Sequence, residues 1–275
     1  MKTLRVGRWV TFLLATSLAM SVSGVANASR SHKILPPHVP ASNWRIPANT
    51  PLLALINGAR AAQEGLSPLS LNITRYNRLT IPEQMFVITN LERVSRGEVP
   101  AYGLMAKLNQ VANVGARLQR DPLPPASWGF FQSVWAGGMS LRTQAAFYSD
   151  FAWMYEDGPA PYYGGIHNID CPVKTAAGCW GHRSAVIELY PDVSFAGPPL
   201  TLVAGASGGA ANTRYVTSSA MIFVWVPGVP ASGITYTWVR AVKFLGLPAR
   251  YVPSPVTTTV QDSTTVPDST IIVQG

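Results

Sequence analysis

The reactive and polar side chains of this chain are most concentrated in residues Trp153–Arg183, which read WMYEDGPAPYYGGIHNIDCPVKTAAGCWGHR. The stretch contains an acid, Glu156, and an imidazole, His182. It also carries both cysteines of the chain, Cys171 and Cys179. Charged residues make up only 12% of the sequence and there are four histidines in all, so no other segment gathers polar chemistry in this way. We therefore expect any functional site to lie here.

The chain opens with the three-part pattern of a secretory signal peptide. Basic residues come first, an apolar run follows over Trp9–Met20, and small residues end in Ala26-Asn27-Ala28. We predict a signal peptide over residues 1–28 and hence a secreted, extracellular protein. A membrane anchor is the alternative, but the apolar run is shorter than the roughly 20 residues of a bilayer span. No later segment reaches that length, so we expect no transmembrane segment after signal removal.

The charge balance is mildly basic. The formal net charge is +8 at pH 7, and removal of the signal takes away three positive charges and no negative ones, which leaves +5. Such an excess is compatible with anionic polymers of a cell surface. Nucleic acid is not an expected partner, because no run of Lys and Arg is interleaved with aromatic residues.

Apolar residues at helical spacing predict four helices, and glycines mark the ends of the first two. Two runs of β-favouring residues flank a Ser/Gly/Ala loop over 207–212, which is typical of a β-hairpin. Helices followed by a hairpin on which they pack favour an α+β sandwich over a βαβ repeat. The expected helices are Leu52–Glu64, Glu83–Arg96, Leu104–Leu118 and Leu141–Tyr155, with a short turn at Arg183–Leu189; Asp121–Gly138 is expected to be extended, and the hairpin strands are Leu200–Ala206 and Tyr215–Val226.

These elements define one folded domain over residues 51–228. Residues 29–50 are rich in Pro, Ser and His without periodicity, which predicts a linker. Residues 229–275 are predicted to be a C-terminal extension, partly flexible, since its end is biased towards Thr, Val, Ser and Asp. Whether this extension closes the fold is left open by the sequence.

Two of the expected helices share an Asn-x-x-Arg motif, formed by Asn57 and Arg60 in one and by Asn90 and Arg93 in the other. A glycine follows each motif within a few residues. The match covers too few positions to define a structural repeat. We interpret it as the same helix-ending chemistry used twice.

The motifs Trp153-Met-Tyr-Glu156 and Gly181-His182, with Cys171 and Cys179 between them, resemble those of the CAP superfamily. That family comprises the cysteine-rich secretory, antigen-five and pathogenesis-related proteins, also called SCP-like, and its bacterial exported members are the most similar. The resemblance covers about residues 51–227. It implies a CAP-like three-layer α-β-α sandwich with a small antiparallel sheet and a central cleft.

In that family the cleft often holds two histidines and two glutamates, which bind a divalent metal in some members. Glu156 and His182 match one residue of each type. The other two positions carry Arg120-Asp121-Pro122 and Ser133-Val134-Trp135 in this chain. A metal such as zinc needs three or four ligands at once, so a zinc site at His182 would need further ligands from the loop that precedes it.

Three roles stay open for Glu156 and His182. They could act as an acid/base pair, contact a bound ligand, or satisfy each other as buried polar groups. No Gly-x-Ser-x-Gly elbow supplies a nucleophile. The even pair Cys171 and Cys179, in an exported chain, predicts a disulfide, and a two-thiolate metal site is the alternative.

Aromatic residues gather around the proposed cleft in the sequence: Trp135, Trp153, Tyr155 and Trp180. Aromatic faces suit sugar rings and apolar ligands, so these four are candidate ligand contacts together with Glu156 and His182. The alternative is that they pack the core and its rim.

The sequence thus predicts a secreted, non-catalytic CAP-like protein that binds an extracellular ligand, such as a lipid, a glycan or a cell-wall polymer. One alternative is an exported hydrolase, metal-assisted or not, that uses His182 and Glu156. Another is a structural envelope protein. A lone Asn-x-Thr sequon at Asn72 is a glycosylation site only if the export route glycosylates.

Overall fold

The computed structural model describes residues 51–128, 130–138, 144–156, 181–187, 200–210 and 217–251. The expected signal peptide and linker, residues 1–50, lie outside these ranges. All five expected helices and helical turns are present at least in part among the described residues, and the mixture of helices and sheet confirms an α+β fold.

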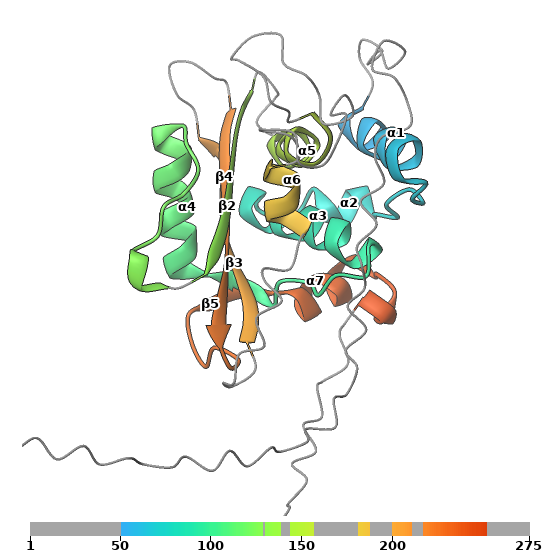
Figure 1. Ribbon diagram of the computed structural model, residues 1–275. Helices are drawn as coiled ribbons and strands as arrows, with labels where there is room; N and C mark the ends of the chain where they lie inside the picture. Colours follow the sequence, from blue (N-terminus) through green and yellow to red (C-terminus); the bar gives the residue numbers. More distant parts are fainter. Residues whose placement is uncertain are drawn as a thin grey trace, which may run out of the picture. The chain divides into compact units, whose positions relative to one another are not determined.

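The described strands form one five-stranded sheet in the order β2-β4-β3-β1-β5 (Figure 1). The expected hairpin is β3 and β4, and β2 pairs antiparallel with β4. The sheet is mixed rather than antiparallel, because β1 runs parallel to β3. β3 also extends into the expected loop, with a register shift between Ser207 and Ala210. The strands are β1 (Gly103–Met105), β2 (Phe131–Gly138), β3 (Leu200–Ala210), β4 (Thr217–Pro227) and β5 (Ile234–Thr237).

Local sequence signals, such as capping residues and glycines, fix the ends of several helices. Thr80 and Glu83 form a capping box at the start of α3, and Gly65 ends α1 in the left-handed conformation at φ 64°. The expected helix at Leu104 starts two residues later, because Gly103–Met105 pair with β3 and β5. The helices are α1 (Leu52–Glu64), α2 (Ile73–Tyr76), α3 (Ile81–Ser95), α4 (Ala106–Leu118), α5 (Ala145–Phe151) with a π-helical turn (Ala152–Glu156), α6 (Gly181–Ile187) and α7 (Trp238–Leu245).

Alternate residues of β3 and β4 pack against different helices, as the pleat of a strand requires. Val203 and Ile222 contact the α4 side, where Leu108 and Ala112 are buried. Leu202 and its neighbours on the other face belong to the main core, to which α3 contributes most. Figure 1 shows α4 on one face of the sheet and α3, α5 and α6 on the other.

The chain beyond residue 228 takes part in the fold. β5 pairs with β1, and Phe86 of α3 packs edge-on against the rings of Tyr236 and Trp238. The indole Nε1 of Trp238 donates to the carbonyl oxygen of Tyr251 at 2.7 Å. The open question about the extension is thereby answered for residues 229–251, whereas 252–275 lie outside the description.

Candidate functional site

The expected site residue His182 lies at the start of α6 and meets an acid from elsewhere in the chain. Its Nε2 is 3.3 Å from Oδ1 of Asp121, and the two side chains are 27% and 47% exposed. Asp121 belongs to the tripeptide that the sequence resemblance alone aligns with one position of the CAP-superfamily tetrad. Glu156 ends the π-helical turn after α5, and its side chain is not described. A Glu156–His182 contact therefore stays a prediction.

Several other expected site residues fall outside the described ranges. They are Cys171, Cys179 and Trp180, so the disulfide stays a prediction. Among the residues that are described, no group of three or more His, Cys, Asp and Glu is placed to hold a metal ion. Within the same residues, no helix is both long enough and apolar enough to cross a bilayer.

The aromatic candidates have different surroundings. Trp153 and Tyr155 are completely buried, so the described structure puts them in the core, as in the packing alternative. Trp135 is partly buried, and its Nε1 is 2.9 Å from Oγ of Ser218. Asn72, the sequon residue, caps α2 by accepting a hydrogen bond from the backbone N–H of Arg75 at 3.0 Å.

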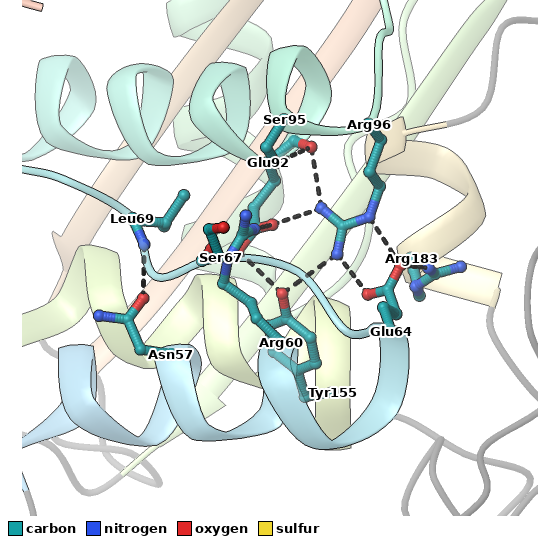
Figure 2. Close-up of polar contacts among 10 residues, drawn as sticks. All are labelled: Asn57, Arg60, Glu64, Ser67, Leu69, Glu92, Ser95, Arg96, Tyr155 and Arg183. Atoms are coloured by element: carbon teal, nitrogen blue, oxygen red, sulfur yellow. Dashed lines mark hydrogen bonds and ion pairs between the residues drawn. The ribbon is translucent and has the colours of Figure 1, made fainter.

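A buried ion network, which the sequence did not predict, lies between α1 and α3 (Figure 2). At its centre the fully buried carboxylate of Glu92 accepts hydrogen bonds from Arg60 and Arg96. The hydroxyl of Tyr155 donates to the second oxygen of Glu92 at 2.9 Å. Glu64 extends the network by accepting from Arg96.

The network continues to α6 through a second acid–base contact. Nη2 of Arg183 is 2.5 Å from Oε2 of Glu64. Burial alone would raise the pKa of Glu64, but the guanidinium groups of Arg96 and Arg183 hold it below its usual value. Five charged groups from three helices are thus joined: Arg60, Glu64, Glu92, Arg96 and Arg183.

The two Asn-x-x-Arg motifs form hydrogen bonds with the loops that follow their helices. Oδ1 of Asn57 accepts from the N–H of Leu69, and Oδ1 of Asn90 accepts from the N–H of Ala101, each at 2.8 Å. The Nε groups of the two arginines donate to loop carbonyls: Arg60 to Ser67 at 3.2 Å and Arg93 to Val99 at 2.7 Å. Matching contacts from matching residues support the interpretation of one helix-ending device used twice.

Asp150 of α5 is a fully buried acid next to this network. Neither of its oxygens has a hydrogen-bond partner in the part of the chain that the structure describes. Burial raises the pKa of Asp150 well above its usual value, and the charge of Glu92 adds to the shift against the opposing charges of Arg60 and Arg96. An acid with this environment favours its neutral form.

We predict that Asp150→Asn flattens the pH dependence of stability. A raised folded-state pKa means that the linked stability is fully present below the unfolded pKa of about 4 and is lost as the pH rises through the folded pKa. The asparagine amide does not ionise in this pH range, so the variant keeps its stability as the pH rises. Urea unfolding from pH 4 to pH 8 measures the change, with Glu83→Gln as the matched control, because Glu83 lies in an exposed capping box where glutamine also serves. Equal slopes for Asp150→Asn and the parent would contradict the prediction.

A cleft lies between α1, α2, α3 and α5. It has a volume of about 700 Å³, which is within the range of small-molecule sites. The described residues of its lining carry no charged side chain, and their polar side-chain groups are amides. The lining residues are Pro51, Leu52, Leu53, Ile73, Asn77, Leu79, Ile81, Gln84, Gln144 and Phe147.

The amide of Gln84, at the cleft wall, is already engaged by the protein. Its Nε2 donates to the carbonyl oxygens of Tyr76 and Leu79, at 3.3 and 3.2 Å. The hydroxyl of Tyr76 donates to the backbone carbonyl of Gln84 at 3.1 Å. These bonds fix α2 against α3, so this wall of the cleft is preformed.

Comparison of the chain with protein-family models, with curated proteins and with solved structures gave no match. The resemblance to the CAP superfamily therefore rests on the sequence motifs alone.

Proposed function

We propose that this chain is a secreted, non-catalytic binding protein whose cleft between α1, α2, α3 and α5 holds the apolar part of an extracellular ligand. The single observation that carries the proposal is the cleft itself, with its volume of about 700 Å³ and its largely apolar lining. A lipid or similar amphiphile suits this lining better than a glycan, because sugar hydroxyls need more hydrogen-bonding groups than the amides of Asn77 and Gln144 offer.

The proposal includes a CAP-like three-layer sandwich. Its support is the pair of motifs around Glu156 and His182, together with the placement of α4 and α3 against opposite faces of the sheet. The ion network fits a structural role within such a domain, because its acids and bases are paired with one another beneath the surface.

An exported hydrolase is the second candidate, and one observation favours it. The imidazole of His182 has a carboxylate, Asp121, at 3.3 Å, and both side chains are partly exposed. A carboxylate that orients an imidazole is a working part of many acid–base sites. Turnover of ester, amide or glycoside substrates by the mature protein, lost in His182→Ala, would favour this candidate over the binding protein. A structural envelope protein would show neither turnover nor ligand uptake.

We predict that Asn77→Trp abolishes uptake of a fluorescent fatty acid, cis-parinaric acid, by the mature protein. Asn77 is exposed at the cleft rim, so an indole there fills space that the ligand needs. Each methylene kept out of the cleft costs about 0.8 kcal/mol, so exclusion of two already weakens binding by about tenfold. Fluorescence titration measures the dissociation constant.

Val114→Trp is the matched control for this variant. It places the same ring on the exposed side of α4, away from the cleft lining, and its affinity should equal that of the parent within about twofold. Circular dichroism establishes that both variants fold. Equal binding by the parent, Asn77→Trp and Val114→Trp would refute the assignment of the ligand to this cleft.

A further inference from the structure

The structure separates the charges of the domain into a paired interior and a cationic surface. The acids Glu64, Glu92, Glu98 and Asp150 are buried or nearly so. The buried cations are Arg60, Arg93 and Arg183, with Arg96 almost buried beside them. Glu64 and Glu92 pair with interior cations and Asp150 favours its neutral form, so these three acids do not offset the cations at the surface. Among the described residues, the exposed charged side chains are therefore mostly cations.

Exposed cations gather where α2 meets α7. Nη1 of Arg75 donates to the carbonyl oxygen of Phe244 at 3.2 Å, and the guanidinium carbon of Arg78 lies 5.8 Å from the ring centroid of Phe244. On α7 itself, Arg240 and Lys243 lie three residues apart on the exposed side. We call Arg75, Arg78, Arg240 and Lys243 the α2–α7 face.

The acidic residue that borders this face, Glu83, is hydrogen-bonded within its own helix cap. Glu83 accepts hydrogen bonds from the backbone N–H and the hydroxyl of Thr80, both at 2.8 Å, in the capping box of α3. The guanidinium carbon of Arg240 stacks 5.2 Å from the ring centroid of Tyr236. Burial and then the charge of Glu83 raise the pKa of Tyr236, and the charge of Arg240 lowers it, so Glu83 borders the face on the side of Arg240.

The face also carries apolar side chains, and it shares a segment with the cleft. Val239 is 52% exposed next to Arg240, and Ile73 is 38% exposed on α2. Ile73 and Leu79 line the cleft, whereas Arg75 and Arg78 of the same short segment reach α7. One segment thus forms the rim of the cleft and half of the cationic face.

We infer that the α2–α7 face docks the domain on an anionic lipid surface, where its four cations bind head-group phosphates and the side chains of Ile73 and Val239 enter the head-group layer. This inference rests on the proposed function, because docking there brings lipid chains to the rim of the cleft. Arginine forks match phosphate oxygens, and exposed apolar residues between cations suit a lipid interface better than a soluble polyanion.

The strength of docking follows from the number of cations. Near an anionic membrane each Lys or Arg improves binding by roughly fivefold, and salt screens the effect. Docking is therefore reversible and falls steeply with ionic strength.

Vesicle co-sedimentation tests the inference with the mature protein. We expect binding to vesicles of phosphatidylcholine with 30% phosphatidylglycerol at low salt, and little binding to pure phosphatidylcholine or in 0.5 M NaCl. The combined variant Arg78→Gln, Arg240→Gln and Lys243→Gln should bind about 100-fold more weakly, which is the product of three roughly fivefold losses. Arg75 is kept, because its bond to Phe244 joins α2 to α7.

The matched control removes the same charge from α4 and from a position two residues beyond its end, with Lys107→Gln, Arg117→Gln and Arg120→Gln, all exposed. It should retain vesicle affinity within about fivefold. Equal losses in the two combined variants would overturn the inference, as would equal binding to neutral and anionic vesicles. Binding to soluble polyglutamate as strong as to vesicles would overturn it in favour of a polymer surface.

Asn77→Trp separates the two proposals. It should bind anionic vesicles as the parent does while losing cis-parinaric acid. If the parent takes up the fatty acid but does not bind vesicles, only the proposed docking face is refuted. If it binds vesicles but takes up no fatty acid, only the proposed cleft ligand is refuted.

Discussion

Replacing Glu92 with alanine is expected to lower the free energy of unfolding by about 3–5 kcal/mol, the cost typical of breaking a buried ion pair. Glu92 is 0% exposed and accepts hydrogen bonds from Arg60, Arg96 and Tyr155. Its removal leaves the guanidinium of Arg60 buried without an acidic partner. Arg96 loses one of its two acidic partners and keeps Glu64. The penalty comes from uncompensated buried charge more than from the attraction that is lost.

Urea unfolding of the parent and the variant measures this loss. Glu83→Ala in the same helix is the matched control, because Glu83 belongs to an exposed capping box and its loss should cost only about 1 kcal/mol. Should Glu92→Ala fail to fold at all, Glu92→Gln keeps the shape and removes the charge, and it should still cost more than Glu83→Ala. Comparable losses at Glu92 and Glu83 would show that the network contributes no more than a surface cap.

The parts of the fold that local chemistry controls were predictable from the sequence. α1 has the expected range, and the ends of α3 differ from the expected ones by only one or two residues. Hydrophobic periodicity and helix ends are determined by residues close together in sequence. β1 was missed, since its three residues are apolar and run directly into α4. Only its pairing with β3, about 100 residues away, and with β5, about 130 residues away, makes Gly103–Met105 a strand.

The ion network was missed for a different reason. On a helix an Arg or Glu usually lies in solvent, so Arg60 and Glu92 gave no sign of burial. A signal was available in the spacing, because Arg60 with Glu64 and Glu92 with Arg96 each form an i,i+4 pair on a helix that also carries the Asn-x-x-Arg motif. In a chain with so few charges, two such pairs on neighbouring helices could have indicated a shared interior contact.

The candidate site was predictable only in part, because its partners are distant in sequence. The contact between His182 and Asp121 joins α6 to the segment after α4, and no local pattern relates them. The cleft likewise draws its walls from four helices. Motifs therefore indicated where chemistry is concentrated, whereas the apolar cavity emerged only when those helices were assembled.

Gly205→Ala is expected to lower the free energy of unfolding by about 3 kcal/mol or more, at the upper end of the cost of overpacking. Gly205 lies in β3, and a Cβ there would be 2.2 Å from the backbone carbon of Leu108 and 2.4 Å from its carbonyl oxygen. Since these are backbone atoms of α4, no side-chain rotation relieves the clash. Either α4 moves away from the sheet or β3 distorts.

Gly58→Ala is the matched control for this variant. Gly58 lies on the exposed side of α1, and a Cβ there meets nothing within 4 Å, so the variant should be stabilised by about 0.5–1 kcal/mol. Urea unfolding compares the two substitutions, and hydrogen exchange should show the largest loss of protection in α4. A Gly205→Ala variant as stable as the parent would mean that α4 does not approach β3 this closely. Glycine is therefore required at residue 205 because the α4 backbone lies directly on the sheet, with no room for even a methyl group between them.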